Sequence, residues 1–263
     1  MISSMVRGII KAHRGSLFLC RPSSNSASAD APTLFPMLPP DIESEQSEIS
    51  VRIEDMFNAR VHYGHKVGTL KNNMKWAIYG ERMGVCIFDL DVTQKYLTRA
   101  LNFLAHSSYH GSMVLFITTN KAQMLPLEKM AMEMNQYCHT KQWRDGTFLN
   151  SRTYFGASIR LPDVVVFLTT LTSTLQPHPA IAECAKMAIP TIGIVDTNAE
   201  VSYLTYPIPG NDDSLVSFNY YMNMFKSAIE YGQKYQEKQT DAEKKQMCKE
   251  KEESKTAKKK VLK

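Results

Sequence analysis

Between residues 50 and 232 the chain alternates short apolar runs with amphipathic segments, and this alternation restricts the folds open to it. Strand-sized runs rich in apolar and β-branched residues occur at 84–90, 112–120, 162–168 and 190–198. Because these runs are apolar on both faces, we expect parallel strands with helices covering both sides of a sheet. The pattern predicts a three-layer α/β/α domain over residues 50–232.

Apolar residues at helical spacing predict the elements between these strands, at 50–60, 91–110, 123–136, 179–189 and 214–232. Ser50 and Asp91 are suited to cap the first two helices, and Gly111 is suited to end the second. Pro126 is expected in the first turn of the third helix, where proline is tolerated.

The two ends of the chain differ from this middle part. Residues 1–29 combine arginines, a lysine and many serines with no acid, which is typical of a mitochondrial transit peptide; a disordered start is the alternative. Residues 30–49 read as an acidic, proline-rich linker, and residues 233–263 as a lysine-rich charged tail. That tail is either solvated or in contact with phosphates. The net charge of +5 comes mainly from these ends.

Several classes of protein are disfavoured by what the sequence lacks. No apolar run approaches the roughly 20 residues of a membrane span. The five cysteines are odd in number and form no CxxC pair, which favours a reducing compartment over a disulfide framework. Glycine-rich dinucleotide and phosphate loops, the GxSxG nucleophile motif and HExxH are all missing. We therefore expect no catalytic residues and no cofactor.

Acidic residues follow several predicted strands, namely Asp89, Asp91, Asp196, Asp212 and Asp213. Carboxylates at strand ends can bind magnesium or act as a general base. Asp91 and Asp213 also stand where helix caps are needed, and Asp196 stands in a turn, so caps and turns are the preferred interpretation.

Two histidine pairs have spacings that occur in metal sites. His62 and His65 form HxxH, and His106 and His110 lie four residues apart on a predicted helix. Neither pair has a cysteine or carboxylate nearby at ligand spacing, so no metal site is expected.

The segment 58–82 carries the most specific functional pattern. It combines five cations with rings and glycines that favour close approach of the backbone: Arg60, Lys66, Lys71, Lys75 and Arg82, with His62, Tyr63, His65, Trp76, Gly64 and Gly68. Cations and rings on an irregular loop are suited to phosphate contacts and to stacking on unpaired bases. A solvated loop with a half-buried tryptophan is the alternative.

A second patch at 142–156 places Trp143, Arg144, Arg152 and Tyr154 around a glycine turn. The same two interpretations apply to it, namely RNA binding or an ordinary surface loop.

Six ordered segments give the chain a resemblance to the ribosomal protein S2 family, in its mitochondrial form. They lie at 61–91, 115–123, 142–150, 161–168, 185–198 and 206–214, and include the distinctive GHK, WRDGT, IPTIGIVDTN and PGNDDS. The resemblance implies a flavodoxin-like domain with a five-stranded parallel sheet. It also implies a structural, rRNA-binding role in the small subunit of the mitochondrial ribosome, in the matrix, with rRNA and other small-subunit proteins as partners. No enzymatic activity, small-molecule substrate or membrane contact is implied.

The resemblance also assigns residues. It places His62, Tyr63, His65 and Lys66 near rRNA or neighbouring proteins, and it aligns Trp143, Arg144, Gly146, Thr147 and Asn150 with the family's second loop. Asp145 stands where bacterial members usually carry glycine. Bacterial members insert a long helical hairpin between the positions of Asn150 and Leu161, whereas this chain has ten residues there. Any contact that the hairpin makes is therefore either absent or supplied by another protein.

Two other interpretations stay open on the sequence alone. One is a nucleotide-binding or phosphate-handling enzyme of the mitochondrial matrix on the same scaffold, which the missing glycine motifs disfavour. The other is a cytosolic relative whose N-terminus is not cleaved.

Overall fold

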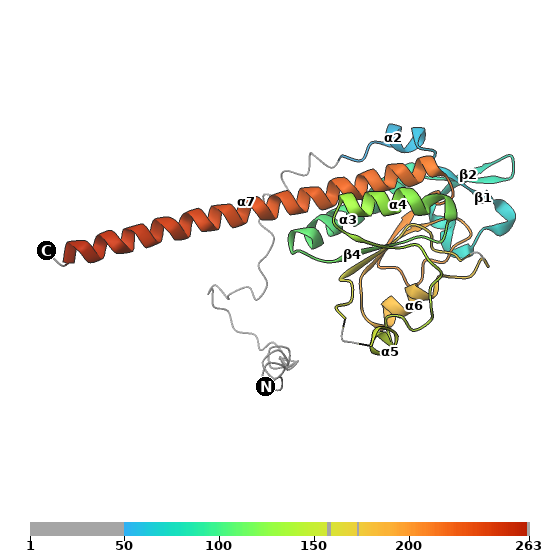
Figure 1. Cartoon of the computed structure of the whole chain (residues 1–263). Helices are drawn as coiled ribbons and strands as arrows, with labels where there is room; N and C mark the ends of the chain where they lie inside the picture. Colours follow the sequence, from blue (N-terminus) through green and yellow to red (C-terminus); the bar gives the residue numbers. More distant parts are fainter. Residues whose placement is uncertain (1–49, 157–158, 173, 262–263) are drawn as a thin grey trace, which may run out of the picture. The chain divides into compact units, whose positions relative to one another are not determined.

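The computed structural model describes residues 50–261 apart from 157–158 and 173, and side chains only as far as residue 240. The predicted transit peptide at 1–29 and linker at 30–49 lie outside the described residues. Figure 1 shows the helices and strands of the described part. No helix within it is long and apolar enough to cross a membrane.

A five-stranded parallel sheet with the order β5-β4-β6-β7-β8 forms the centre of the domain. Its strands are β4 (Val114–Ile117), β5 (Tyr137–His139), β6 (Val164–Phe167), β7 (Thr191–Val195) and β8 (Tyr206–Pro209). From β4 the chain first adds β5 on one side and then crosses to β6 on the other. The predicted parallel sheet is confirmed, and its winding direction changes between β4 and β6.

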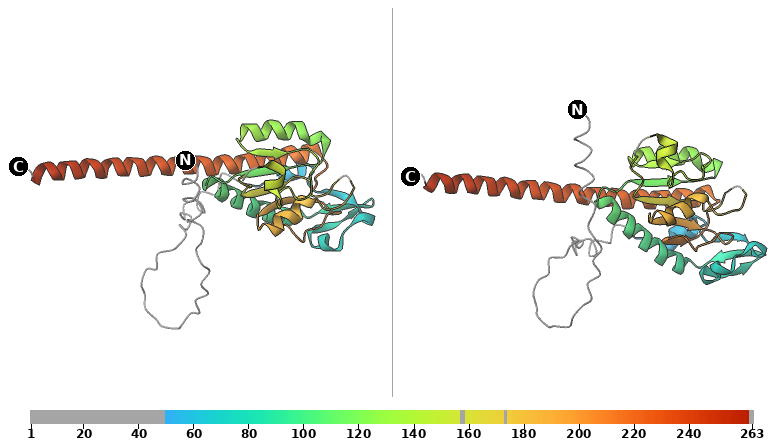
Figure 2. Two further views of the ribbon diagram at one scale, coloured as in Figure 1. Left: turned by 60° about the horizontal axis from the view of Figure 1, so that its bottom comes forward. Right: turned by 90° about the horizontal axis from the view of Figure 1, so that it is seen from below.

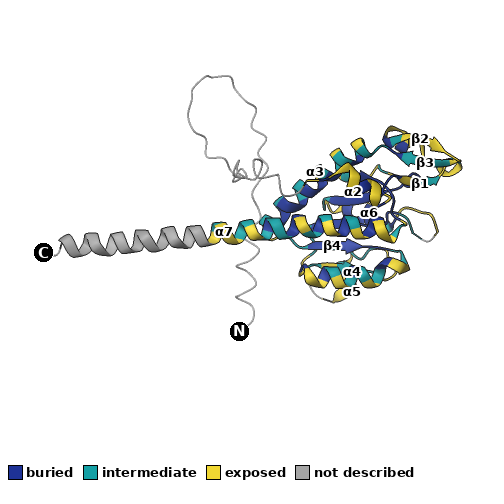
Figure 3. Cartoon of the chain, turned by 90° about the horizontal axis from the view of Figure 1, so that it is seen from above, coloured by how far each residue is buried: buried dark blue, intermediate teal, exposed yellow. Residues whose placement is uncertain are grey.

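Helices cover both faces of this sheet, which confirms the three-layer prediction. On β6, Val164 and Val166 pack into one apolar cluster, while Val165 and Phe167 pack into another on the opposite face. The first face is covered by α3 (Leu90–Tyr109), α4 (Lys121–Glu133) and α7 (Leu215–Val261). The second is covered by α6 (Pro179–Lys186), and Figure 3 shows β4 buried between the layers.

The predicted strand at 84–90 exists as β3 (Val85–Phe88), but its expected place in the parallel sheet is wrong. It forms the middle of a separate antiparallel sheet, between β1 (Tyr63–Lys66) and β2 (Ile78–Arg82). An apolar run indicates that a strand is buried but does not specify its partner. Phe88 packs in a small cluster that includes Val195, at the end of β7.

The sequence analysis did not predict β5 or β8. β5 has only three residues, and β8 is interrupted by prolines, so neither gives a clear apolar run. β8 contains two prolines, Pro207 and Pro209, which fit an edge strand because proline lacks the N–H needed for a ladder hydrogen bond.

The segment 58–82 is also more regular than the predicted loop. Besides β1 and β2 it contains the 3₁₀ helices η3 (Val67–Thr69) and η4 (Asn72–Ala77). Glycine and polar residues in this segment favoured a loop, but pairing of β1 and β2 with β3 orders it.

Two predicted caps are shifted. Ser50 does not cap α2 (Ile53–Asn58), whose N-cap position is occupied by Arg52 without a side-chain hydrogen bond. Asp89, and not Asp91, caps α3, because its carboxylate accepts the N–H of Asp91 at 3.0 Å. The cap therefore lies two residues earlier than predicted, and the helix begins at Leu90.

Pro126 lies in the second turn of α4, so its predicted place in the first turn is wrong. The helix begins at Lys121 because Asn120 caps it, accepting the N–H of Ala122 at 3.1 Å. The predicted end of α3 is confirmed by Gly111, which follows the helix with a φ of +69°.

The closing helix is longer than the predicted 214–232. The structure has one continuous helix, α7, which runs through the lysine-rich segment to Val261 and extends past the sheet (Figure 2). Where α7 crosses α3, a Cβ on Gly232 would collide with the backbone oxygen of Ala105 and lie 2.9 Å from the Cβ of Ser108. Glycine at this position allows the two helices to pack closely.

We predict that Gly232→Ala lowers the free energy of unfolding by about 2 kcal/mol, because the methyl group has no space between α7 and α3. Urea unfolding followed by circular dichroism measures this change. Gly80→Ala is the matched control, since no atom lies within 4 Å of the added Cβ. Unchanged or increased stability of Gly232→Ala would contradict the close packing, because alanine is the better helix former.

Candidate nucleic-acid interface

The cations of the first predicted patch lie on the antiparallel sheet and its adjoining turns. Lys66 ends β1, Arg82 ends β2, and Lys71 and Lys75 lie at the start of η4 and within it. All four side chains are exposed. In the described part of the chain none of them takes part in an ion pair, so their charges are available to an external partner.

His65 connects this sheet to the carboxyl end of the parallel sheet. Its Nδ1 lies 3.0 Å from a carboxylate oxygen of Asp196, which directly follows β7, and its Nε2 lies 3.3 Å from a carboxylate oxygen of Asp213. Hydrogen bonds to these two carboxylates raise the pKa of His65 from 6.5 to about 10. The ring is therefore a cation at neutral pH, and both of its nitrogens are engaged within the chain.

The backbone beside His65 is tied to the same turn. The N–H of His65 donates to the hydroxyl of Thr197 at 3.0 Å. A Cβ on Gly64 would lie 2.6 Å from the Thr197 methyl group, so only glycine permits this approach. The close approach predicted at Gly64 thus occurs within the chain. Gly68, by contrast, has open space around it.

The acidic residues around His65 act differently from the predicted caps. Asn211, and not Asp213, accepts the N–H groups of Asp213 and Ser214 before α7, at 3.0 and 3.3 Å. Asp213 instead binds His65, which lowers the pKa of the Asp213 carboxyl group. Burial, together with the neighbouring Asp196 and Asp213, raises the pKa of Asp212. The predicted role of Asp196 in its turn is observed, since its carboxylate accepts the N–H of Thr197.

His62 and Tyr63 belong to a short stack of rings. The imidazole of His62 lies parallel to Phe57 at 4.5 Å between ring centroids and contacts Tyr63 at 4.3 Å. His62 is buried, which lowers its pKa, whereas Phe57 and Tyr63 expose 59% and 48% of their surface. His62 therefore supports the rings that reach solvent. Arg60 is exposed, with a φ of +59°, and its carbonyl accepts the side-chain amide of Asn211.

We predict that His65→Gln destabilises the fold by about 3 kcal/mol at pH 6, because it leaves the buried Asp196 carboxylate without its cation. The folded-state pKa is raised, so the stabilisation is complete below pH 6.5 and is lost as the pH rises through about 10. Urea unfolding at pH 6, 8 and 10 should show the difference from the unmodified chain shrinking. His110→Gln, at an exposed helix end, is the control. A difference that stays constant over this range would contradict the ion pair.

The second patch is held by the buried carboxylate of Glu183 on α6. Its two oxygens accept the indole N–H of Trp143 at 3.2 Å and the backbone N–H groups of Gly146 and Phe148 at 2.6 and 2.9 Å. Glu183 exposes only 4% of its surface. One carboxylate thus fixes the whole turn, and the sequence analysis did not identify this role.

Trp143 is buried, with 8% of its surface exposed, and packs edge-on against Phe148 and His139. Its ring is a core contact of the loop and is not presented for base stacking. Trp76, in contrast, exposes 43% of its surface and rests on Tyr96.

The polar members of the second patch lie around a left-handed glycine. Gly146 has a φ of +85°, so glycine is needed there. Position 145 does not need the glycine that bacterial members carry, because the φ of Asp145 is not positive. Arg144, Asn150 and Arg152 are exposed, and the partly buried Thr147 donates its hydroxyl hydrogen to the carbonyl of Arg144 at 2.6 Å. Arg152 lies on α5 (Ser151–Phe155).

Glu183→Gln should cost about 2 kcal/mol of unfolding free energy, because an amide nitrogen replaces one of the two oxygens that accept N–H groups. Urea unfolding followed by tryptophan fluorescence measures the stability, with a signal to which both Trp143 and the exposed Trp76 contribute. The exposed Glu54→Gln is the control. Equal stability of the two variants would show that Glu183 does not hold this turn.

The two patches are separate regions of one domain. β1 and β2 lie at one end of the domain, while α5 lies beside α6 under the parallel sheet (Figure 1). Among the described residues, no group of three or more His, Cys, Asp or Glu is placed to hold a metal ion. The described cysteines Cys86, Cys138 and Cys184 are free thiols.

Comparison with known proteins assigns the α/β domain to a family. The family model of ribosomal protein S2 matches residues 56–161 and 155–232, which is nearly all of the α/β domain. The chain belongs to the ribosomal protein S2 family. This confirms the resemblance noted from the GHK and PGNDDS segments.

Individual relatives of the S2 family agree with this assignment. Small ribosomal subunit protein uS2m of Bos taurus is 40% identical over 177 residues, which is 67% of this chain and 60% of the relative. The uS2m protein of Neurospora crassa is 33% identical over 202 residues, covering 69% of this chain and 47% of the relative. The uS2 protein of Rickettsia bellii is 27% identical over 226 residues, covering 69% of this chain and 76% of the relative.

The matched region thus spans about half to three fifths of the two uS2m relatives. These relatives are the mitochondrial form, which confirms the predicted mitochondrial location. The RNA contacts assigned to individual residues of this S2 protein stay predictions.

Proposed function

We propose that this chain is a structural component of the small subunit of the mitochondrial ribosome, where it supports translation by binding rRNA and neighbouring ribosomal proteins. The observation that carries the proposal is a set of exposed cations, Lys66, Lys71 and Lys75, on a segment whose backbone is fixed. None of the three forms an ion pair with another described residue. The S2 family is structural and not enzymatic, and its relatives are named as small-subunit proteins.

A fixed backbone matters because ordering a loop on binding costs conformational entropy. Pairing of β1 with β3, together with the contacts of His65 to Asp196 and Thr197, orders the segment before RNA arrives. The backbone N–H of Lys71 also donates to the carbonyl of Thr197 at 2.9 Å. The lysines can therefore neutralise phosphates at defined positions.

Exposed rings accompany these cations. Tyr63 and Trp76 expose 48% and 43% of their surface, and Tyr79 on β2 exposes 80%. Rings of this kind stack on unpaired bases or pack against a neighbouring protein. In the second patch, Arg144, Asn150 and Arg152 supply further polar contacts to RNA.

The segment that replaces the bacterial hairpin is suited to a protein neighbour. In place of the hairpin, the described residues form the single short helix α5. Leu149, Tyr154, Phe155 and Ile159 around it are exposed, with 42%, 45%, 53% and 46% of their surface accessible. Apolar side chains gathered on a surface favour contact with another protein over contact with phosphates.

Replacing Lys66, Lys71 and Lys75 together with glutamate should displace the protein from small subunits on a sucrose gradient, because three favourable phosphate contacts become repulsive. A matched control reverses three other exposed lysines, Lys129, Lys186 and Lys234. Co-sedimentation of the first variant at the level of the unmodified protein would refute the assigned surface. Equal displacement of both variants would refute its specificity.

A further inference from the structure

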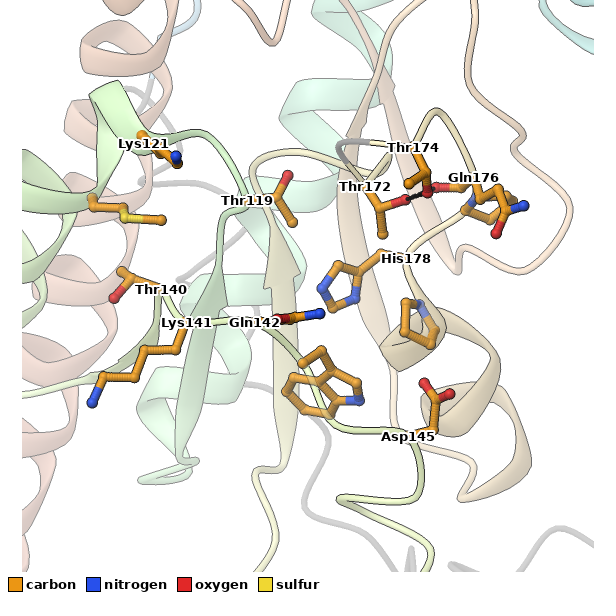
Figure 4. Close-up of a pocket in the computed structure, with 14 residues that line it drawn as sticks. Thr119, Lys121, Thr140, Lys141, Gln142, Asp145, Thr172, Thr174, Gln176 and His178 are labelled. Atoms are coloured by element: carbon orange, nitrogen blue, oxygen red, sulfur yellow. Dashed lines mark hydrogen bonds between the residues drawn. The ribbon is translucent and has the colours of Figure 1, made fainter.

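A cavity of about 670 Å³ lies at the carboxyl ends of β4 and β6 (Figure 4). It adjoins the second patch, which contributes Gln142, Trp143 and Asp145 to its wall, and none of its lining residues belongs to the first patch. Its walls come from the start of α4, the segment after β5, and the loop between β6 and α6. This is the point at which the winding of the sheet changes direction. In open α/β sheets, ligands bind in the crevice at this point, because the loops on its two sides diverge.

A buried histidine faces the cavity with one free donor. His178 exposes 1% of its surface, and its Nδ1 accepts the N–H of Ala180 at 3.2 Å, capping α6. Burial, followed by the nearby His139, lowers the pKa of His178 to about 4, so the ring is neutral. A neutral ring that accepts at Nδ1 carries its hydrogen on Nε2. Among the described residues this Nε2 has no partner, and the ring lies at the cavity wall (Figure 4).

Hydrogen bonds within the chain hold the walls in place. The Thr172 hydroxyl lies 2.9 Å from that of Thr174 and 3.1 Å from the carbonyl of Gln176. The Thr119 hydroxyl, after β4, donates to the carbonyl of Leu171 at 2.9 Å. The loop after β6 is thereby fastened to the loop after β4, so the cavity is formed before any ligand enters.

Cationic residues line one side of the cavity, and an acidic residue lines the other. Lys121 and Lys141 lie on the side formed by α4 and β5, and Asp145 lies on the side of α6 (Figure 4). Lys121 occupies the first turn of α4, where the helix dipole adds to the attraction for an anion. A ligand that fits has an anionic group at one end and hydrogen-bond donors at the other.

We propose that this cavity binds a ribonucleoside phosphate, supplied either by a free nucleotide or by an unpaired nucleotide of RNA. The phosphate lies toward Lys121 and Lys141, the ribose hydroxyls donate toward Asp145, and Nε2 of His178 donates to an acceptor on the base. The volume lies within the roughly 300–1,000 Å³ typical of small-ligand sites. The RNA source rests on the proposed function, whereas the free-nucleotide source does not.

Isothermal titration calorimetry on the purified full-length chain, free of ribosomes, tests the proposal. The ligands are uridine and adenosine 5′-monophosphates, inorganic phosphate, and a short single-stranded oligoribonucleotide. We expect a nucleotide or the oligonucleotide to bind more tightly than inorganic phosphate. Lys121→Glu with Lys141→Glu should weaken binding about tenfold or more, the size of effect expected for charge-assisted contacts. Tight binding of the mononucleotide identifies the free source, and binding of the oligonucleotide alone identifies RNA.

Three control variants make the result specific. Lys129→Glu with Lys186→Glu changes the charge equally outside the cavity and should leave affinity within about twofold. His178→Asn keeps a side chain that can cap α6 but removes the Nε2 donor, and should weaken binding several-fold while circular dichroism is unchanged. The triple variant of Lys66, Lys71 and Lys75 should bind the mononucleotide normally, which separates this site from the first patch.

Two outcomes overturn the proposal. One is the absence of heat from every nucleotide and oligonucleotide up to millimolar concentration. The other is binding that the Lys121, Lys141 and His178 substitutions leave unchanged.

Loss of co-sedimentation by the triple lysine variant, with mononucleotide binding retained, would support both proposals independently.

Discussion

Two buried carboxylates hold the polar loops of this protein in place. Asp196, at the end of β7, binds His65 of the antiparallel sheet, and Glu183, on α6, binds the turn that begins at Trp143. A buried carboxylate is unfavourable unless donors surround it, so each one requires its loop to adopt a particular conformation. The exposed cations on these loops owe their positions to carboxylates that are themselves buried.

The parallel sheet makes this arrangement possible. Strands such as β6 and β7 are buried along their whole length between the helix layers, and their carboxyl ends lie at one edge. Asp196, the loops after β4 and β6, and the turn before α7 all follow those ends. The same edge therefore carries the anchor for the antiparallel sheet and, at the change in winding direction, the cavity beside His178. Close packing of α7 on α3 at Gly232 completes the layer on one face.

The surface around α5 is the region in which this chain differs from the bacterial S2 proteins. Between Asn150 and Leu161, where the resemblance implies a long hairpin in bacterial members, this chain has α5 and a group of exposed apolar side chains. The cationic surface lies elsewhere, on β1, β2 and η4. The region around α5 combines exposed apolar side chains with Arg144 and Arg152, whereas the lysines of the first patch lie on the antiparallel sheet and its turns.

The sequence by itself determined the layers, most of the helices and the family. Apolar periodicity is a local signal, and the GHK, WRDGT and PGNDDS segments can be recognised without knowledge of tertiary contacts. Tertiary structure decided that β3 pairs with β1 and β2, that Asp213 binds His65 instead of capping α7, and that Trp143 is buried on Glu183. The contacts of Asp213 and Trp143 join residues far apart in the sequence, and the pairing of β3 depends on which strands lie beside it in space. A pattern along the chain does not show which group will satisfy a buried polar atom or which strand another strand will pair with.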